Sequence, residues 1–106
     1  MSDVLERIKT EIESHKIVLF MKGEADAPMC GFSAATVQVL KSLDAPFRAV
    51  NVLTNPDVRQ ALPGYSQWPT FPQLFVNGQL IGGCDIVHEL RDSGELKKII
   101  DSALGR

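Results

Sequence analysis

One unbroken run of apolar residues, IVLFM at positions 17–21, limits the folds that are open to this chain. A strand that is apolar on both faces is typical of a sheet that is covered on both sides. The run is far too short to cross a bilayer as a helix, which needs about 20 apolar residues. A second strand is expected at residues 47–52, and a helical pattern at about 32–43 separates the two strands. This strand–helix–strand order makes them parallel.

The strongest turn signal is Asn77-Gly78, which separates the apolar segments 74–76 and 80–81. Because Asn-Gly fits the positive φ angles of a two-residue turn, these segments are expected to form an antiparallel hairpin. Helices are predicted around the strands from apolar residues at helical spacing and from Pro and Gly near the helix ends. The predicted helices span residues 3–14, about 56–64, 85–92 and 95–104, and a loop is predicted at 22–28.

Together these elements predict a single α/β domain over residues 1–106. Its sheet is mixed and has four strands, a parallel pair plus an antiparallel hairpin, with helices on both faces. With 106 residues, of which 44% are hydrophobic, the chain is long enough to bury a substantial core in one domain.

The formal net charge is -2, and acidic and basic residues are mixed along the chain. A chain without a basic patch is a poor candidate for binding nucleic acid. The first residues, MSDVLER, are charged and lack the apolar core of a secretory signal, and no membrane association is expected. Only two cysteines are present, which indicates a reducing compartment and favours the cytoplasm, although a processed organellar protein would share these features.

Cys30-Gly31-Phe32-Ser33 follows the first strand and opens the second predicted helix. A thioredoxin-like redox site has the pattern C-x-x-C, in which the second thiol releases the first from a mixed disulfide. Ser33 cannot perform that step. A disulfide at Cys30 must therefore be resolved by a small thiol, by a partner, or by Cys84, the other cysteine of the chain.

Cys30 is predicted where a loop gives way to a helix, near unpaired backbone N–H groups and the positive end of the helix dipole. Both favour the thiolate, which is the nucleophile and the metal ligand. The alternative is a buried cysteine that serves as a small hydrophobic side chain. The polar loop before Cys30 and the glycine after it favour a reactive thiol.

Four motifs make the chain similar to the monothiol glutaredoxins along essentially its whole length. They are FMKG at 20–23, CGFS at 30–33, WPTFPQL at 68–74 and GGCD at 82–85. Four matches in the right order are far more specific than any one of them alone. The resemblance implies a thioredoxin-like fold and a binding site for glutathione beside the CGFS thiol.

Glutathione has two carboxylates, one ammonium group and a peptide backbone. The resemblance implies that Lys22 and Arg59 bind its glycyl carboxylate through charge-assisted hydrogen bonds. Taken alone, each side chain is more simply a solvated surface charge. The resemblance also implies a cis bond between Phe71 and Pro72, although only about 5–6% of X–Pro bonds in folded proteins are cis. Phe71, which follows Thr70, then offers its backbone N–H and C=O to the cysteinyl unit.

The GGCD motif provides the last part of the implied site. Gly83 lets the backbone approach a ligand closely at a helix start, where free N–H groups bind carboxylates. Asp85 would face the ammonium group, and capping its helix is the alternative. Cys84 has three open roles, as a second redox thiol, a contact to glutathione or a bystander, of which the ligand contact is favoured. The predicted glutathione site comprises Lys22, Cys30, Gly31, Phe32, Arg59, Thr70, Phe71, Pro72, Gly83, Cys84 and Asp85.

A [2Fe-2S] cluster usually requires four thiolates, and one chain offers a single well-placed candidate, Cys30. The resemblance implies that two chains share the cluster, each supplying Cys30 and one glutathione, so the cluster-bound form is a homodimer and the apo form a monomer. The scattered cysteines and histidines argue against a zinc site within one chain. His15 and His88 are predicted to be neither metal ligands nor catalytic bases, and Trp68 to support the turn that follows it.

The leading hypothesis is a glutathione-dependent carrier that receives and transfers a labile [2Fe-2S] cluster. A BolA-type protein and iron–sulfur recipient proteins are the partners that the family implies. The alternative is an oxidoreductase in which Cys30 removes glutathione from protein mixed disulfides. Its turnover is expected to be weak, because the loop at residues 24–28 is longer than in the dithiol glutaredoxins. A regulatory binding module is a third hypothesis.

Overall fold

The structure, a computed structural model, describes residues 3–106. Residues 1–2, which belong to the predicted charged N-terminal segment and the predicted 1–106 domain, lie outside the described residues. The helices are α1 (Asp3–Ser14), α2 (Gly31–Ser42), α3 (Pro56–Ser66), α4 (Cys84–Ser93) and α5 (Glu95–Leu104). The strands are β1 (Ile17–Met21), β2 (Gly23–Glu24), β3 (Ala27–Pro28), β4 (Arg48–Asn51), β5 (Gln73–Val76) and β6 (Gln79–Gly82).

The main sheet has four strands in the order β4-β1-β5-β6. β1 is parallel to β4 and antiparallel to β5, which in turn pairs with β6 in the predicted hairpin. Asn77 and Gly78 form the turn of this hairpin with φ angles of 52° and 78°. The predicted mixed sheet, one parallel pair with an antiparallel hairpin, is therefore confirmed.

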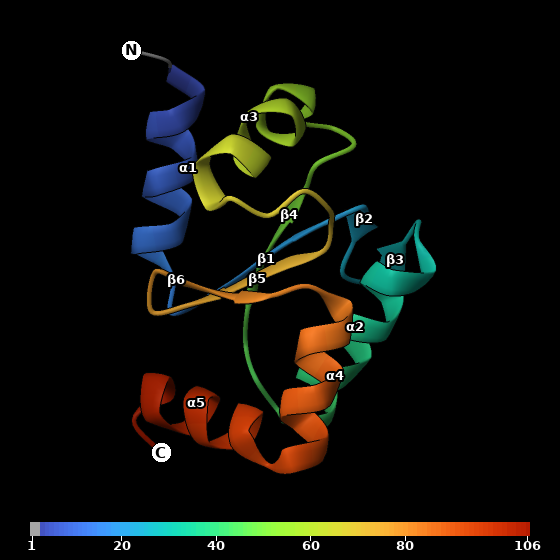
Figure 1. Cartoon of the computed structure of the whole chain (residues 1–106), viewed down its shortest axis with the longest axis vertical. Coiled ribbons are helices and arrows are strands. Elements are labelled where there is room, and N and C mark those ends of the chain that lie inside the picture. Colours follow the sequence, from blue (N-terminus) through green and yellow to red (C-terminus); the bar gives the residue numbers. More distant parts are fainter. Residues whose placement is uncertain (1–2) are drawn as a thin grey trace.

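The apolar run of β1 supplies side chains to both faces of the sheet. Ile17, Leu19 and Met21 pack in a core with α2, α4 and α5, whereas Val18 and Phe20 pack in a second core with α1 and α3. Figure 1 shows the sheet between these two groups of helices. All five side chains of β1 are almost completely buried, which explains why the strand has no polar face.

The segment before Cys30 differs from the prediction of a loop at residues 22–28. It contains β2 and β3, which pair as a small antiparallel hairpin outside the main sheet. Gly23 has a φ angle of 100°, and the backbone N–H of Met29 donates to the carbonyl oxygen of Lys22 at 2.9 Å. Strands of two residues are too short to show the alternation by which a sequence reveals a strand.

Two further findings concern the helices. α3 extends to Ser66, slightly beyond its predicted end near Gly64, and the side chain of Gln67 then donates to the Gly64 carbonyl oxygen at 2.7 Å. None of the helices within residues 3–106 combines the length and the apolar character needed to span a membrane.

Candidate functional site

Cys30 is the N-cap residue of α2, and one residue, Met29, separates it from the β2–β3 hairpin. Its side chain is half-buried, while Met29 and Phe32 beside it are 72% and 63% exposed. A side chain at an N-cap lies close to backbone N–H groups that have no partner within the helix. The thiol is therefore accessible and lies at the positive end of α2.

The surroundings of Cys30 lower the pKa of its thiol. The largest cause is a hydrogen bond that the backbone N–H of Ser33 donates to the sulfur. The backbone N–H of Phe32, the charge of Lys22 and the hydroxyl of Ser33 act in the same direction, and partial burial opposes them. Each of these donors stabilises negative charge on the sulfur, so the thiolate form expected at a helix start is favoured.

Ser33 has a structural contact that its sequence position does not reveal. Its side chain is fully buried, and its hydroxyl oxygen accepts a hydrogen bond from the backbone N–H of Lys22 at 3.1 Å. The residue at the position of a resolving cysteine therefore connects α2 to the residue that follows β1. The same hydroxyl lies close enough to donate to the sulfur of Cys30.

Cys30 opens onto a cavity of about 510 Å³, hereafter the thiol cavity. It lies where α2 and α4 begin and where β1 ends, with α3 at its side. Gly31 does not line it, but the other predicted site residues do. The predicted residues in its wall are Lys22, Cys30, Phe32, Arg59, Thr70, Phe71, Pro72, Gly83, Cys84 and Asp85, and Pro63, Trp68 and Pro69 complete the lining.

The thiol cavity has charged groups of both signs. Lys22 comes from the end of β1, Arg59 from α3 and Asp85 from the first turn of α4. The N-cap of α4 is Gly83, so the alternative role of Asp85 as the helix cap is wrong. Two cations and one carboxylate around a thiol suit a ligand with carboxylates and an ammonium group.

The segment that carries Pro72 is held by buried polar contacts. The Phe71–Pro72 peptide bond is cis, which confirms that prediction. The side-chain amide of Gln73, which is fully buried, donates to the carbonyl oxygens of Trp68 at 2.9 Å and Thr70 at 3.1 Å. These bonds fix the turn between α3 and β5 and keep the backbone of Phe71 at the wall of the thiol cavity.

Gly83 is placed where a side chain has little room. A Cβ atom at this position would lie 3.1 Å from the indole nitrogen of Trp68 and 3.3 Å from the carbonyl oxygen of Pro72. The Trp68 side chain therefore packs against the start of α4. The absence of a side chain at Gly83 lets α4 begin against this turn and brings Cys84 to the cavity.

Cys84 is the first residue of α4, is half-buried, and has a partner that the sequence analysis missed. Nδ1 of His88 lies 3.5 Å from the sulfur of Cys84 and 2.8 Å from the carbonyl oxygen of the same residue. The signal was visible in the sequence, because residues four apart on a helix lie on one face.

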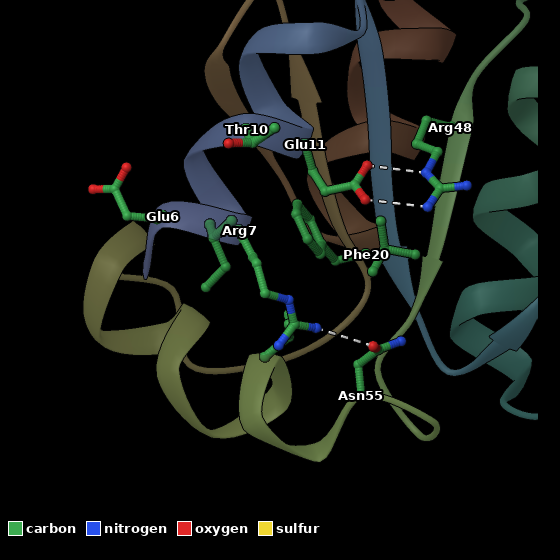
Figure 2. Close-up of a pocket in the computed structure, with 10 residues that line it drawn as sticks. Glu6, Arg7, Thr10, Glu11, Phe20, Arg48 and Asn55 are labelled. Atoms are coloured by element: carbon green, nitrogen blue, oxygen red, sulfur yellow. Dashed lines mark hydrogen bonds and ion pairs between the residues drawn. The ribbon is translucent and has the colours of Figure 1, made fainter. Parts of the chain in front are cut away.

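A second cavity, of about 280 Å³, lies between α1, α3 and β4, away from both cysteines. Figure 2 shows the ion pair between Glu11 and Arg48 and the contact between Arg7 and Asn55 in this region. Glu11 accepts two hydrogen bonds from the Arg48 guanidinium, at 2.9 and 3.1 Å, and Arg7 donates to Asn55 and Asp57. These contacts attach α1 to β4 and α3, which supports a structural role for this region.

Within residues 3–106, no three or more His, Cys, Asp or Glu side chains gather in a group that could hold a metal ion.

The chain is similar to known proteins and solved structures along nearly its whole length. Residues 17–81 match the family model described as Glutaredoxin. "Glutaredoxin 4" of Buchnera aphidicola (strain Bp) is 52% identical over 100 residues, which cover 94% of this chain and 93% of that protein. "Probable monothiol glutaredoxin 2" of Rickettsia felis is 53% identical, with 90% and 91% covered. The solution structure of reduced poplar apo GrxS14 is 50% identical, covers 97% of this chain and 94% of that chain, and superposes with a TM-score of 0.85.

Proposed function

The chain belongs to the glutaredoxin family, within its monothiol group, and on that basis we propose that it binds glutathione and carries a labile [2Fe-2S] cluster for transfer to other proteins. The observation that supports this most directly is that Cys30, at the start of α2, is followed by Ser33 at the position where a dithiol site has its second cysteine. The thiol is accessible and its pKa is lowered, yet its helix provides no second thiol to release a disulfide. Such a thiolate depends on an external thiol, either to release a disulfide or to complete a shared set of metal ligands.

Glutathione fits the chemistry of the thiol cavity. Lys22 and Arg59 can bind a carboxylate, Asp85 can bind the ammonium group, and the backbone of Phe71 can pair with the cysteinyl unit as a short strand. Phe71 lies in the cavity wall, directly before Pro72. These contacts would place the glutathione sulfur beside that of Cys30.

The cluster is the cargo in this proposal, and its ligand requirement explains why it is shared. Four thiolates are needed, and two chains with one glutathione each supply two Cys30 sulfurs and two glutathione sulfurs. The bound form is then a homodimer and the apo form a monomer. Ligands that exchange with solution make the cluster easy to release, which suits delivery to recipient proteins or a mixed complex with a BolA-type protein.

Anaerobic reconstitution with iron, sulfide and glutathione tests the proposal. The visible absorption spectrum and the iron and sulfide content should show one [2Fe-2S] cluster for two chains, and omission of glutathione should abolish it. Cys30→Ser should lose the cluster, whereas Cys84→Ser, the matched control at the other cysteine, should retain it. A cluster that persists in Cys30→Ser, or that forms equally well without glutathione, would contradict the proposal.

Thiol–disulfide exchange is the second candidate function, and the lowered pKa of Cys30 favours it. In that reaction the Cys30 thiolate attacks a glutathionylated substrate, and a second glutathione regenerates the thiolate. Slow turnover is expected, because the segment before Cys30, which contains the β2–β3 hairpin, is longer than in the dithiol glutaredoxins. Turnover of a glutathionylated peptide at the rate of a dithiol glutaredoxin would make this the main function.

A further inference from the structure

Lys22 is the residue between β1 and the β2–β3 hairpin, and its backbone is bonded on both sides. Its N–H donates to the hydroxyl oxygen of Ser33 at 3.1 Å, and its carbonyl oxygen accepts from the N–H of Met29 at 2.9 Å. Met29 directly precedes Cys30, and Ser33 follows it in the first turn of α2. The two bonds therefore fix the Lys22 backbone relative to the segment that carries the thiol.

A third contact holds the residue after Lys22, and it comes from another strand. The N–H of Gly23 donates at 3.1 Å to Oδ1 of Asn51, the last residue of β4, which is only 8% exposed. The same oxygen accepts from the N–H of Leu53 at 2.9 Å, and the side-chain amide nitrogen donates to the Glu24 carboxylate at 2.9 Å. Because a carboxylate can only accept and a backbone N–H can only donate, these partners fix the orientation of the Asn51 amide.

Asn51 acts at the point where the chain leaves the main sheet. Met21 is the last residue of β1, pairs in register with Asn51, and accepts at its carbonyl oxygen from the N–H of Val52 at 2.9 Å. Gly23 then turns the chain away with a φ angle of 100°. Because the planar peptide unit joins Lys22 to Gly23, a displaced Gly23 N–H would change the ψ angle of Lys22 and with it the direction of the lysine side chain.

The direction of that side chain matters to the thiol. The pKa of the Cys30 thiol is lowered first by the hydrogen bond from the backbone N–H of Ser33, and the charge of Lys22 lowers it further. Lys22 and Cys30 both line the thiol cavity, whereas Asn51 does not. An effect of Asn51 on the thiol must therefore pass through Lys22 and the hairpin.

We propose that Asn51 is a positioning residue of the thiol cavity, which directs the Lys22 ammonium group toward the Cys30 sulfur and toward a carboxylate bound beside it. The identity of that carboxylate as one of glutathione rests on the proposed function. The effect on the sulfur rests only on the contacts of Asn51 and Lys22.

The test compares two reagents that form the same kind of S–C bond with Cys30, anionic iodoacetate and neutral iodoacetamide. In each reaction the thiolate attacks the carbon and iodide leaves. An ammonium group near the sulfur attracts the anionic reagent, so the ratio of the two rates measures the Lys22 charge at the sulfur. A change in exposure or in the thiolate fraction affects both rates alike. All proteins carry Cys84→Ser, so that Cys30 is the only thiol.

Lys22→Gln should lower the ratio of the iodoacetate rate to the iodoacetamide rate about threefold, the effect of one nearby charge in a solvated site. Asn51→Ala should lower it about twofold, and the double variant should match Lys22→Gln alone, because both changes act through one ammonium group. Asn55→Ala is the matched control. The Asn55 side chain bonds Arg7 and the carbonyl oxygen of Asn51, and its removal should leave the ratio unchanged.

Two outcomes overturn the inference. One is an Asn51→Ala protein that is folded by circular dichroism and has the ratio of the parent. The other is a double variant whose ratio falls below that of Lys22→Gln, which would show that Asn51 acts independently of the lysine. If Asn51→Ala does not fold, Asn51→Ser replaces it with the same expectation, because its shorter side chain no longer reaches Gly23.

Binding of S-methylglutathione, which cannot react with Cys30, tests the part that depends on the proposed function. Isothermal titration calorimetry should show about threefold weaker binding in Lys22→Gln, weaker binding in Asn51→Ala, and no added effect of Asn51→Ala in the Lys22→Gln protein. A parent that does not bind S-methylglutathione, although Asn51→Ala lowers the alkylation ratio, contradicts glutathione as the ligand and with it the proposed function. A parent that binds it, with Asn51→Ala changing neither the affinity nor the ratio, contradicts only the role of Asn51.

Discussion

Ser33 occupies the position of a second cysteine in a dithiol site, and its hydroxyl has contacts of its own there. It accepts from the backbone N–H of Lys22 at 3.1 Å and contributes to the lowered pKa of Cys30. One hydroxyl thus connects Lys22, the cation that follows β1, to α2, whose N-cap residue is Cys30. With serine at this position the site has no resolving thiol, and the serine hydroxyl helps to position Lys22 and Cys30, which both line the thiol cavity.

Replacement of Ser33 by alanine should affect stability and thiol reactivity together. The part-buried N–H of Lys22 loses this acceptor, so the free energy of unfolding should fall by about 1–2 kcal/mol. The Cys30 sulfur loses a donor, so its pKa should rise, and the curve of alkylation rate against pH should move to higher pH. Ser42→Ala, which removes a hydroxyl bonded to the Val39 carbonyl oxygen in the last turn of α2, is the control and should leave the curve in place. An unchanged curve in Ser33→Ala would refute the role of this hydroxyl.

At the scale of elements, the β2–β3 hairpin depends on a contact with the edge strand β4. The buried side chain of Asn51 accepts from the backbone N–H groups of Gly23 at 3.1 Å and Leu53 at 2.9 Å, and it donates to Glu24 at 2.9 Å. A hairpin of two-residue strands has little stability alone. Asn51 therefore holds the segment that leads from Lys22 to Cys30.

Asn51→Ala should destabilise the protein by about 2 kcal/mol, because two backbone N–H groups lose their acceptor. Urea unfolding measures this loss, and amide hydrogen exchange should show faster exchange at Gly23. Asn51→Asp keeps an acceptor oxygen for both N–H groups, so its loss of stability should be smaller than that of Asn51→Ala. If the Gly23 amide of Asn51→Ala exchanges at the wild-type rate, the β2–β3 hairpin is stable without this contact.

The elements that have a long apolar run or a strong turn signal could be predicted from the sequence. The elements that depend on single contacts could not. The IVLFM run and Asn77-Gly78 were sufficient for the main sheet, because burial on both faces and positive φ angles require those residue types. The β2–β3 hairpin has no such pattern and depends on the distant Asn51. The bond from Lys22 to Ser33 joins two elements, and no local spacing predicts such a bond.

The end of the chain supports α2 from another element. The Arg106 guanidinium donates to the carbonyl oxygens of Leu43 at 2.7 Å and Asp44 at 3.1 Å, just after α2, and it also bonds Asp101 of α5. Hydrogen bonds from Lys97 and then from Arg106 hold the pKa of the Asp101 carboxyl below its usual value. A carboxyl with a lowered pKa in the folded state stabilises the fold above its unfolded pKa, and this contribution is lost as pH falls through the lowered value.

Arg106→Ala and Lys97→Ala should each raise the pKa of Asp101, with the larger rise in Lys97→Ala. The measurement is an NMR titration of the Asp101 carboxyl carbon in each variant. Arg91→Ala removes an exposed arginine paired with Asp92 and serves as the control, in which the titration of Asp101 should not move. A titration midpoint for Asp101 that is the same in all four proteins would show that these contacts do not persist in solution.

At the scale of the whole molecule, the sheet separates two cores, and the N-terminal ends of two helices lie at the thiol cavity. Cys30 is the N-cap of α2, and α4 begins at Cys84, so the positive ends of both helix dipoles lie near the cavity that Lys22 and Arg59 also line. The chain as a whole carries a net charge of -2. The region around the thiol is thus locally positive on an acidic protein, which favours an anionic ligand there.

A cluster shared by two Cys30 residues would bring two copies of this region together, so the exposed apolar side chains beside the thiol should decide how firmly the copies associate. Phe32 and Met29 are 63% and 72% exposed. Burying a phenylalanine contributes about 1.5–3 kcal/mol, so Phe32→Ser should weaken the reconstituted dimer at least about tenfold, and Met29→Ser less. Anaerobic sedimentation followed in the cluster absorption band measures the dimer, and the alkylation rate of Cys30 in the apo protein should stay unchanged. Tyr65→Ser, an exposed aromatic position outside the thiol cavity, should leave the dimer intact. Equal dimer stability in Phe32→Ser and Tyr65→Ser would mean that the two chains meet through another surface.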